Sequence, residues 1–243
     1  MRLAALIPAR YSAQRLPGKP LADIGGAPMV VRVAQQVRKA EGVDEVAVAT
    51  DDARIAEAVT AAGFRALMTD RACRNGTERV AQAARDLPAE GYLNVQGDEP
   101  LIDPAAVAQV AAMLRAGSQM ATLARRLEAS EAALPQVVKV VCDARGRALY
   151  FSRSLIPYPR SAAELPALAH LGIYGFSAPA LQQFARLPET ALERAEGLEQ
   201  LRALFHGIPI DVGVGDFRSA SVDTAQDLER ARRLFADQTR RNG

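Results

Sequence analysis

Short apolar runs alternate with amphipathic helical segments along the first half of the chain. Four runs have the length and composition of strands buried on both faces: Leu3–Ile7, Val43–Ala49, Phe64–Met68 and Tyr92–Val95. Three intervening segments place apolar residues at helical spacing: Pro28–Ala40, Asp52–Ala62 and Thr77–Leu87. This alternation predicts right-handed strand-helix-strand units, and hence an α/β fold with a mainly parallel sheet flanked by helices.

The second half contains a hairpin signal that breaks the alternation. Val137–Val141 and Ala148–Ser152 flank Asp143–Gly146, where aspartate at the first position and glycine at the fourth suit a type I turn. We therefore expect an antiparallel hairpin inserted into the parallel scheme. Because an isolated two-stranded ribbon is only marginally stable, residues 136–160 are a candidate dimerisation hairpin and loop. The remaining expected strands are Gln119–Arg126, Ala169–Phe176 and Ile208–Val214, and the remaining helices are Pro104–Arg115, Pro179–Phe184, Leu192–Phe205 and Thr224–Phe235.

Composition bounds the class of protein. With 243 residues, 49% of them hydrophobic, the chain can bury one core over residues 1–243 without disulfide or metal support. A net charge of +2, from 30 basic and 28 acidic side chains, is too balanced for a general nucleic-acid binder. The two cysteines and two histidines lack zinc-type spacing, and no apolar stretch approaches the roughly 18 residues that a membrane span needs. We expect a cytoplasmic protein that binds neither nucleic acid nor membrane.

The loop after the first strand concentrates positive charge. Arg10, Arg15 and Lys19 lie within a stretch of ten residues after Leu3–Ile7, at the edge where ligands of open α/β sheets bind. Folded over the sheet, two forked guanidiniums and one ammonium form a polyphosphate clamp, whereas on a solvated surface loop they have no such role. The spacing matches neither a Walker A loop nor a dinucleotide fingerprint.

Two aspartates are candidate ligands for a divalent cation. Asp98 follows Gly97 at the end of the apolar run Tyr92–Val95, where a carboxylate can reach a hard cation that also binds phosphates. The alternative is a tight turn in which Asp98 caps the next helix. Asp223 could pair with it across the two halves of the chain, or else Asp223 or Thr224 is simply the N-cap of the last helix.

Two further segments are candidate pocket walls. Asn75, Gly76 and Thr77 open a predicted helix with small polar groups and free backbone N–H donors, which suit a base edge, ribose or phosphate, although Thr77 can equally be a plain cap. Along the later strand Ala169–Phe176, alternation places His170 and Tyr174 on one face, as expected for a polar pocket wall.

These segments occur in the order of one enzyme family. The matching stretches are Ile7–Leu21, Ala49–Asp51, Gly76–Arg79, Asn94–Pro100, Val138–Val141, Ala148–Arg153, His170–Gly175, Leu198–Arg202 and Val222–Thr224. They cover nearly the whole chain, and their ordered set resembles the 3-deoxy-manno-octulosonate (Kdo) cytidylyltransferases. The resemblance implies a nucleotide-diphospho-sugar transferase type of α/β fold. It also implies a homodimer that transfers CMP from CTP to the anomeric hydroxyl of Kdo, releasing pyrophosphate, for lipopolysaccharide synthesis.

The resemblance also assigns roles to residues. It implies that CTP is bound by Ala9, Arg10, Arg15, Lys19, Gly76 and Thr77, with Arg10, Lys19 and Asp98 catalytic. It implies Mg²⁺ as cofactor, held by Asp98 and Asp223. The residues implied to surround the sugar are Gln96, Arg153, His170, Tyr174, Glu199 and Gln200.

Local departures from the family pattern leave alternatives open. Leu134-Pro135-Gln136 stands where Asn-Pro-Asn is frequent, the loop between Arg160 and His170 is short, and Phe176 stands where tyrosine is common. A related acceptor, such as 8-amino-Kdo or a sialic acid, is therefore one alternative, although the segments around His170 and Glu199 argue against a sialic acid. A catalytically silent nucleotide-binding module is another, because fold alone does not imply function.

Overall fold

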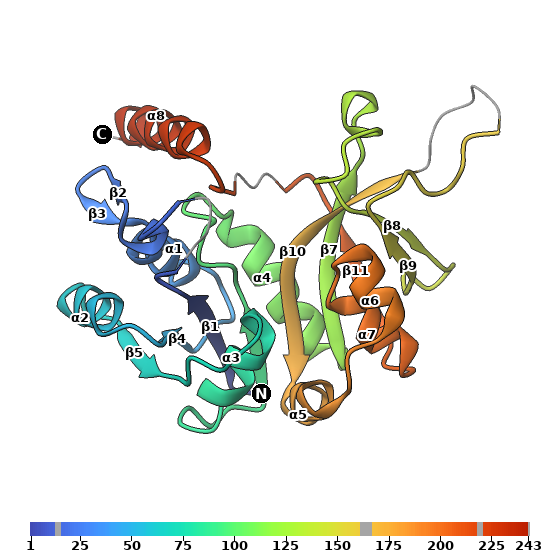
Figure 1. Cartoon of the computed structure of the whole chain (residues 1–243), viewed down its shortest axis with the longest axis horizontal. Helices are drawn as coiled ribbons and strands as arrows, with labels where there is room; N and C mark the ends of the chain where they lie inside the picture. Colours follow the sequence, from blue (N-terminus) through green and yellow to red (C-terminus); the bar gives the residue numbers. More distant parts are fainter. Residues whose placement is uncertain (13–15, 161–166, 218–220, 243) are drawn as a thin grey trace.

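A mixed β-sheet lies between two layers of helices (Figure 1). The computed structural model describes residues 1–12, 16–160, 167–217 and 221–242. The main sheet has the order β11-β7-β10-β6-β1-β4-β5. Its strands are β1 (Leu3–Ala9), β4 (Glu45–Thr50), β5 (Arg65–Met68), β6 (Gly91–Asn94), β7 (Met120–Arg126), β10 (Leu168–Ser177) and β11 (Ile210–Val214). Neighbours are parallel except at β10, which runs antiparallel to both β6 and β7. The predicted mainly parallel sheet is confirmed, with β10 as the one reversed strand in this order.

The helices agree with the sequence except at one break. They are α1 (Met29–Val37), α2 (Ala53–Ala61), α3 (Gly76–Ala83), α4 (Pro104–Arg115), α5 (Ala178–Arg186), α6 (Ala191–Glu196), α7 (Gln200–Phe205) and α8 (Ala225–Asn242), with a short 3-10 turn η2 (Ala129–Glu131). The continuous helix expected over Leu192–Phe205 is wrong, because Gly197 adopts a left-handed conformation (φ +61°) that ends α6. None of the described helices is apolar over a length that would cross a lipid bilayer.

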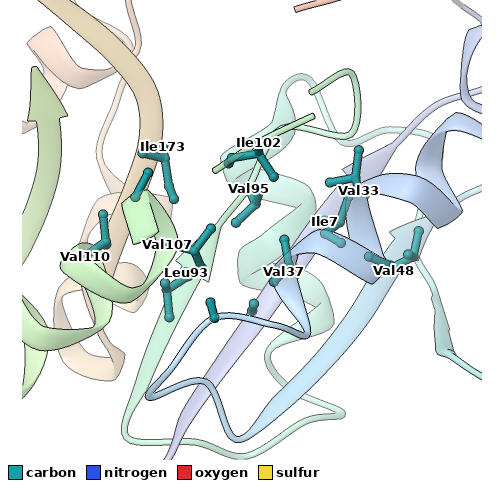
Figure 2. Packing of buried hydrophobic residues seen from close by; sticks show 14 of the residues in the cluster. Ile7, Val33, Val37, Val48, Leu93, Val95, Ile102, Val107, Val110 and Ile173 are labelled. Carbon is teal, nitrogen blue, oxygen red and sulfur yellow. The ribbon is translucent and has the colours of Figure 1, made fainter. Parts of the chain in front are cut away.

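β1 shows how the sequence builds the three layers. All its residues from Leu3 to Ile7 are fully buried. Leu3, Ala5 and Ile7 pack with α1, α2 and α4, whereas Ala4 and Leu6 face the layer that contains α3, α5 and α7. Figure 2 shows the first of these clusters around Ile7, Leu93 and Val107. An uninterrupted apolar run is therefore needed, because both faces of the strand lie in the core.

The C-terminal segment returns across the molecule to the first half. β11 lies at one end of the sheet, yet α8 packs beside β2 (Asp23–Ile24) and β3 (Ala27–Pro28) near α1 (Figure 1). Ile24, Met29, Val222, Leu228 and Ala231 form a separate buried cluster at this contact. Val222 is fully buried there, which fixes the backbone of the adjacent Asp223.

The predicted hairpin is confirmed, but it is not isolated. β8 (Lys139–Cys142) and β9 (Ala148–Ser152) pair antiparallel around a turn in which Gly146 N donates to the Asp143 carbonyl oxygen at 3.1 Å. β8 also pairs with β10 through Val140 and Lys139. The hairpin therefore continues the main sheet, which supports it within one subunit. Dimerisation through residues 136–160 remains a prediction.

Candidate active site

A pocket opens at the carboxyl ends of β1 and β6, where ligands of open α/β sheets bind. Its volume is about 410 Å³. The residues expected from the sequence that line it are Ala9, Arg10, Lys19, Gly76, Gln96 and Asp98. The remaining described lining is Pro8, Ser12, Pro20, Arg79 and Gly97. We refer to this cavity as the β1 pocket.

Two glycines let separate loops pack against the end of β1. A Cβ atom at Gly97 would lie 2.8 Å from the Pro8 carbonyl oxygen, which is too close for any other residue without movement of the backbone. A Cβ atom at Gly76 would lie 3.3 Å from Pro8 Cγ, which is tight. The start of α3 and the loop that carries Asp98 are therefore held directly beside β1.

The Lys19 ammonium joins two carboxylates that are far apart in the sequence. Its Nζ donates to Asp98 Oδ2 at 2.8 Å, to Asp223 Oδ1 at 3.2 Å and to the Val222 carbonyl oxygen at 2.9 Å. The Lys19 side chain is 15% exposed, and those of Asp98 and Asp223 are 28% and 40% exposed. Lys19, Asp98 and Asp223, here called the Lys19 cluster, thus place one positive and two negative charges at the edge of the β1 pocket.

Asp98 does not cap the following helix. Asp103 does so instead, since its Oδ1 accepts a hydrogen bond from the Ala105 N–H at 2.9 Å. The capping alternative for Asp98 is therefore wrong, and its carboxylate contacts Lys19 rather than a helix terminus.

Asp223 likewise lies just outside its helix. Thr224 is the N-cap of α8, because its Oγ1 accepts from the Asp227 N–H at 3.2 Å while Asp227 Oδ2 accepts from the Thr224 N–H at 2.9 Å. Of the two residues that the sequence allowed as the cap, the structure selects Thr224. The Asp223 carboxylate contacts Lys19 and does not cap α8.

The aspartate pair has the donor chemistry of a magnesium site that is completed by phosphate. Within the described ranges, no three His, Cys, Asp or Glu side chains gather closely enough to hold a metal ion. Mg²⁺ is commonly held by one or two carboxylates, while phosphate oxygens and water complete its octahedron. Asp98 and Asp223 fit that arrangement, whereas a metal site built wholly from protein side chains does not fit.

Of the two predicted arginines of the loop, one can be placed. Arg10 is exposed and lines the β1 pocket, and its Nη1 donates to the Arg74 carbonyl oxygen at 3.4 Å. Arg15 lies outside the described residues, so its assignment to CTP stays a prediction. Arg10 and Lys19 bring two cationic groups to one cavity, as the clamp interpretation requires.

The start of α3 presents backbone rather than a threonine hydroxyl to the pocket. Asn75 is the N-cap, since its Oδ1 accepts from the Glu78 N–H at 2.8 Å, so the capping alternative for Thr77 is wrong. Thr77 is buried, and its Oγ1 accepts from Asn94 Nδ2 at 3.1 Å. Gly76 therefore lines the pocket, whereas Thr77 supports it from behind.

Sequence reasoning missed Arg79 as a wall of the pocket. Its side chain is fully buried, its Nη2 lies 3.2 Å from Asp51 Oδ2, and its Nη1 donates to Thr69 Oγ1. Asp51 and Thr69 follow the ends of β4 and β5, so this guanidinium ties α3 to the edge of the sheet. Arg79 and Asp51 are the last residues of two segments shared with the family, Gly76–Arg79 and Ala49–Asp51. This resemblance was the sequence signal that could have pointed to them.

The predicted sugar residues largely gather beside the β1 pocket. The His170 and Tyr174 rings on β10 have centroids 5.4 Å apart, which confirms that they share one face. A Cβ atom at Gly172, between them in sequence, would lie 4.0 Å from Gln96 Cγ, and Gln96 lines the pocket. Glu199 approaches the same place, because it interacts with both Tyr174 and Thr77. We call His170, Tyr174, Glu199 and Gln200 the β10 wall.

The titratable side chains of the β10 wall are desolvated by burial, and some of its polar atoms have no hydrogen-bond partner among the described residues. Burial lowers the pKa of His170 to about 3, so the imidazole is neutral at pH 7. Burial also raises the pKa of Tyr174 and of Glu199, and for Glu199 a hydrogen bond from Thr77 opposes the rise. Within the described part of the chain, Glu199 Oε2 and Gln200 Nε2 are buried without a hydrogen-bond partner. Such orphaned atoms are costly and indicate a place for polar ligand groups.

Arg153 is hydrogen-bonded to backbone carbonyl groups near the end of α6, and its assignment to the sugar stays a prediction. Its guanidinium donates to the carbonyl oxygens of Glu196 at 2.6 Å, Pro135 at 3.1 Å and Gly197 at 3.3 Å, where α6 ends. It lines a separate hollow beside Pro135 and Leu155. Arg153 therefore holds the junction between α6 and α7 through these hydrogen bonds. Glu199 belongs to the same junction.

Comparison with known proteins agrees with this geometry. The model of the cytidylyltransferase family matches residues 4–210. The chain belongs to the cytidylyltransferase family. A 3-deoxy-manno-octulosonate cytidylyltransferase from Anaeromyxobacter sp. (strain Fw109-5) is 53% identical over 97% of both chains. One from Escherichia coli is 44% identical over 98% of this chain and 97% of its own.

A solved structure extends the likeness within the cytidylyltransferase family to three dimensions. CMP:2-keto-3-deoxy-manno-octonic acid synthetase complexed with CTP superimposes with a TM-score of 0.94 at 44% identity, over 98% of this chain and 100% of that one. The expected α/β fold with an inserted antiparallel hairpin is therefore confirmed. The chain is a nucleotidyltransferase, with the β1 pocket at the position that the fold class favours for a ligand.

Proposed function

We propose that the chain transfers CMP from CTP to the anomeric hydroxyl of Kdo and releases pyrophosphate. The observation that carries the proposal is the Lys19 cluster, which joins three charged side chains from distant segments at the edge of the β1 pocket. Relatives named for this reaction match the chain from end to end. Acceptor and nucleotide would meet between the β1 pocket and the adjoining β10 wall.

Catalysis would rest on positioning and charge stabilisation. Attack of the sugar hydroxyl on the α-phosphorus spreads negative charge over the phosphoryl oxygens and the departing pyrophosphate. Arg10 and Lys19 supply the cations that neutralise this charge, and Arg15 is proposed to add a third. The backbone at Ala9 and Gly76 is proposed to hold ribose and base, because both lie in the wall of the pocket. The reaction needs no side-chain nucleophile.

Mg²⁺ is proposed as the cofactor, held by Asp98 and Asp223 together with phosphate oxygens. When bound, the ion would withdraw charge from the phosphoryl oxygens and lower the pKa of the sugar hydroxyl. Asp98 is held beside the pocket by Gly97, and Asp223 is held by the buried Val222. Both carboxylates are therefore positioned by the fold before any ligand binds.

The β10 wall is proposed to recognise the sugar. Glu199 Oε2 offers an acceptor and Gln200 Nε2 offers donors, and no described residue uses either atom. His170 Nε2 lies 2.9 Å from Thr122 Oγ1, which fixes the ring beside Tyr174. A site that holds unpaired polar groups rejects an acceptor that cannot pair with them. Gln96 would lie between sugar and nucleotide, and Arg153 would act from the junction of α6 and α7.

The cellular setting is proposed from the same family. We infer that the product serves lipopolysaccharide synthesis in the cytoplasm, and that the enzyme is a homodimer with residues 136–160 in the interface. Leu149 and Tyr158 in that segment are 61% and 84% exposed, which leaves apolar surface for a second copy. Light scattering of the purified chain tests the dimer, and a monomer at micromolar concentration would contradict it.

The decisive experiment measures pyrophosphate release with Mg²⁺ and CTP while the acceptor is varied. Kdo, 8-amino-Kdo and N-acetylneuraminate are offered separately, and each other nucleoside triphosphate then replaces CTP. Release with Kdo and CTP alone is the expected result. Release only with another acceptor would keep the nucleotide chemistry and change the sugar, and no release with any acceptor would contradict the proposal.

A further inference from the structure

Two sets of partners compete for the three N–H groups of the Lys19 ammonium: the carboxylates that it contacts in the structure and the phosphates that it is proposed to bind. An ammonium has three N–H donors, and all three of Lys19 are used by Asp98, Asp223 and the Val222 carbonyl oxygen. The proposed reaction also requires this ammonium to hold phosphate oxygens, and the two carboxylates to hold a divalent cation. One ammonium cannot donate fully to carboxylates and to phosphates at once, so the two sets of partners exclude each other.

The aspartate pair is held together by contacts other than Lys19. The Val222 N–H donates to the Asp98 carbonyl oxygen at 2.9 Å, which ties the two backbones directly. Val222 itself is fully buried against Ile24, Met29, Leu228 and Ala231. Departure of the Lys19 ammonium therefore leaves Asp98 and Asp223 as neighbours, with one opposite charge fewer between them.

The pair is also too small to hold a divalent cation well without help. Across the described residues there is no cluster of three or more possible protein ligands, so phosphate oxygens and water would complete the coordination. A divalent cation that arrives without nucleotide must displace a charge-assisted ammonium and has only the two carboxylates as anionic ligands. A cation that arrives with nucleotide meets carboxylates from which the Lys19 ammonium has already moved to phosphate.

We propose that Lys19 makes divalent-cation binding at Asp98 and Asp223 dependent on a nucleoside triphosphate. The ammonium serves as the counter-cation of the pair and moves to the phosphates when a triphosphate enters the β1 pocket. This role rests on the proposed function, because it takes the nucleotide and the metal from it. It adds an order of binding, in which the nucleotide precedes or accompanies the cation and the cation alone binds weakly.

The test measures Mn²⁺ binding to the full chain without nucleotide, by the electron paramagnetic resonance signal of free Mn²⁺. Wild-type protein is expected to bind weakly. Lys19→Gln is expected to bind at least about tenfold more tightly, since roughly one charge-assisted hydrogen bond no longer competes. Lys39→Gln is the matched control, because Lys39 is exposed on the surface and donates to Gln36, so its affinity should equal that of wild type. Equal Mn²⁺ affinity of Lys19→Gln and wild type would overturn the proposal.

A reciprocal measurement uses Asp98→Asn, so its first comparison does not depend on the folding of a Lys19 variant. CTP binding is measured by calorimetry in EDTA, and Asp98→Asn is expected to bind CTP several-fold more tightly because Lys19 is then less occupied. The gain should shrink in the Lys19→Arg background, which separates release of the ammonium from a simple loss of negative charge. An unchanged affinity of Asp98→Asn would contradict the competition. Neither measurement uses a sugar or turnover, so an enzyme that releases pyrophosphate but fails both tests would keep the function and lose this inference.

Discussion

The β1 pocket and the β10 wall adjoin each other but are built on opposite electrostatic principles. In the pocket, charges are kept and paired, as in the Lys19 cluster and in Arg79 with Asp51. In the wall, burial disfavours charge, since it holds His170 neutral and raises the pKa of Glu199, and polar atoms of Glu199 and Gln200 have no hydrogen-bond partner among the described residues. A polyphosphate is bound by cationic groups, whereas the hydroxyl groups of a sugar can be bound by fixed, uncharged donors and acceptors. The contrast predicts that variants of the two regions will fail in different ways.

The largest expected effect comes from the charged region. Asp98→Asn should retain the fold but lower kcat by about a hundredfold or more, because it removes one of two charged metal ligands at nearly constant volume. Pyrophosphate release and circular dichroism measure the two outcomes. Asp103→Asn is the matched control, since asparagine caps α4 as well as aspartate does. A wild-type kcat in Asp98→Asn would show that Asp98 is not a metal ligand. It would also contradict the contrast between the β1 pocket and the β10 wall.

Lys19→Arg should cost turnover although it conserves charge. A planar guanidinium does not fit the place where the compact ammonium lies between Asp98, Asp223 and the Val222 carbonyl oxygen, so its charge would reach the phosphates from a different position. We expect kcat/KM for CTP to fall by about tenfold or more. Lys39→Arg serves as the control and should be unaffected. Full activity in Lys19→Arg would mean that only the charge matters in the pocket.

In the β10 wall, Gln200→Leu should affect binding of Kdo without lowering the stability of the fold. The substitution removes a buried donor that no described residue pairs with, so the melting temperature should stay or rise while the KM for Kdo increases about three- to tenfold. The KM for CTP should not change. Tyr92→Phe is the opposite control, because its hydroxyl bonds the Leu87 carbonyl oxygen at 3.0 Å and its loss should lower stability without changing either KM. A fall in stability of Gln200→Leu with both KM values unchanged would make Gln200 a purely structural residue.

The smallest expected effect is a pH dependence of stability that originates in the β10 wall. The folded pKa of His170, about 3, lies below its ordinary value of 6.5, so between these values the unfolded chain binds a proton that the folded chain does not. Stability should therefore fall as pH decreases from 6.5 toward 3. His170→Gln should reduce the drop in melting temperature between pH 7 and pH 5, by about 2–4 °C for each kcal/mol removed. Identical drops in both proteins would show that His170 is not desolvated.

Local sequence patterns were sufficient to predict most helices and strands. They failed where the conformation of a single residue ended an element. The apolar run of β1 and the turn at Asp143–Gly146 are local signals, and both are confirmed. The break between α6 and α7 depends on the left-handed conformation of Gly197, which apolar periodicity does not report. The antiparallel direction of β10 is a further case, because strand direction in a sheet follows from the path of the chain around it.

The sequence by itself determined the α/β class, the position of a basic loop after the first strand, and the residue types that nucleotide chemistry requires. These follow from periodicity, charge and order along the chain, which are properties of neighbouring residues. Only the tertiary structure decided that Asp98 and Asp223 share the Lys19 ammonium, that Arg79 is buried beside the pocket and that Arg153 donates to a carbonyl oxygen at the end of α6. Those outcomes depend on which distant backbones the buried Val222 and the glycines beside Pro8 bring within hydrogen-bonding distance, and no local pattern encodes such a distance.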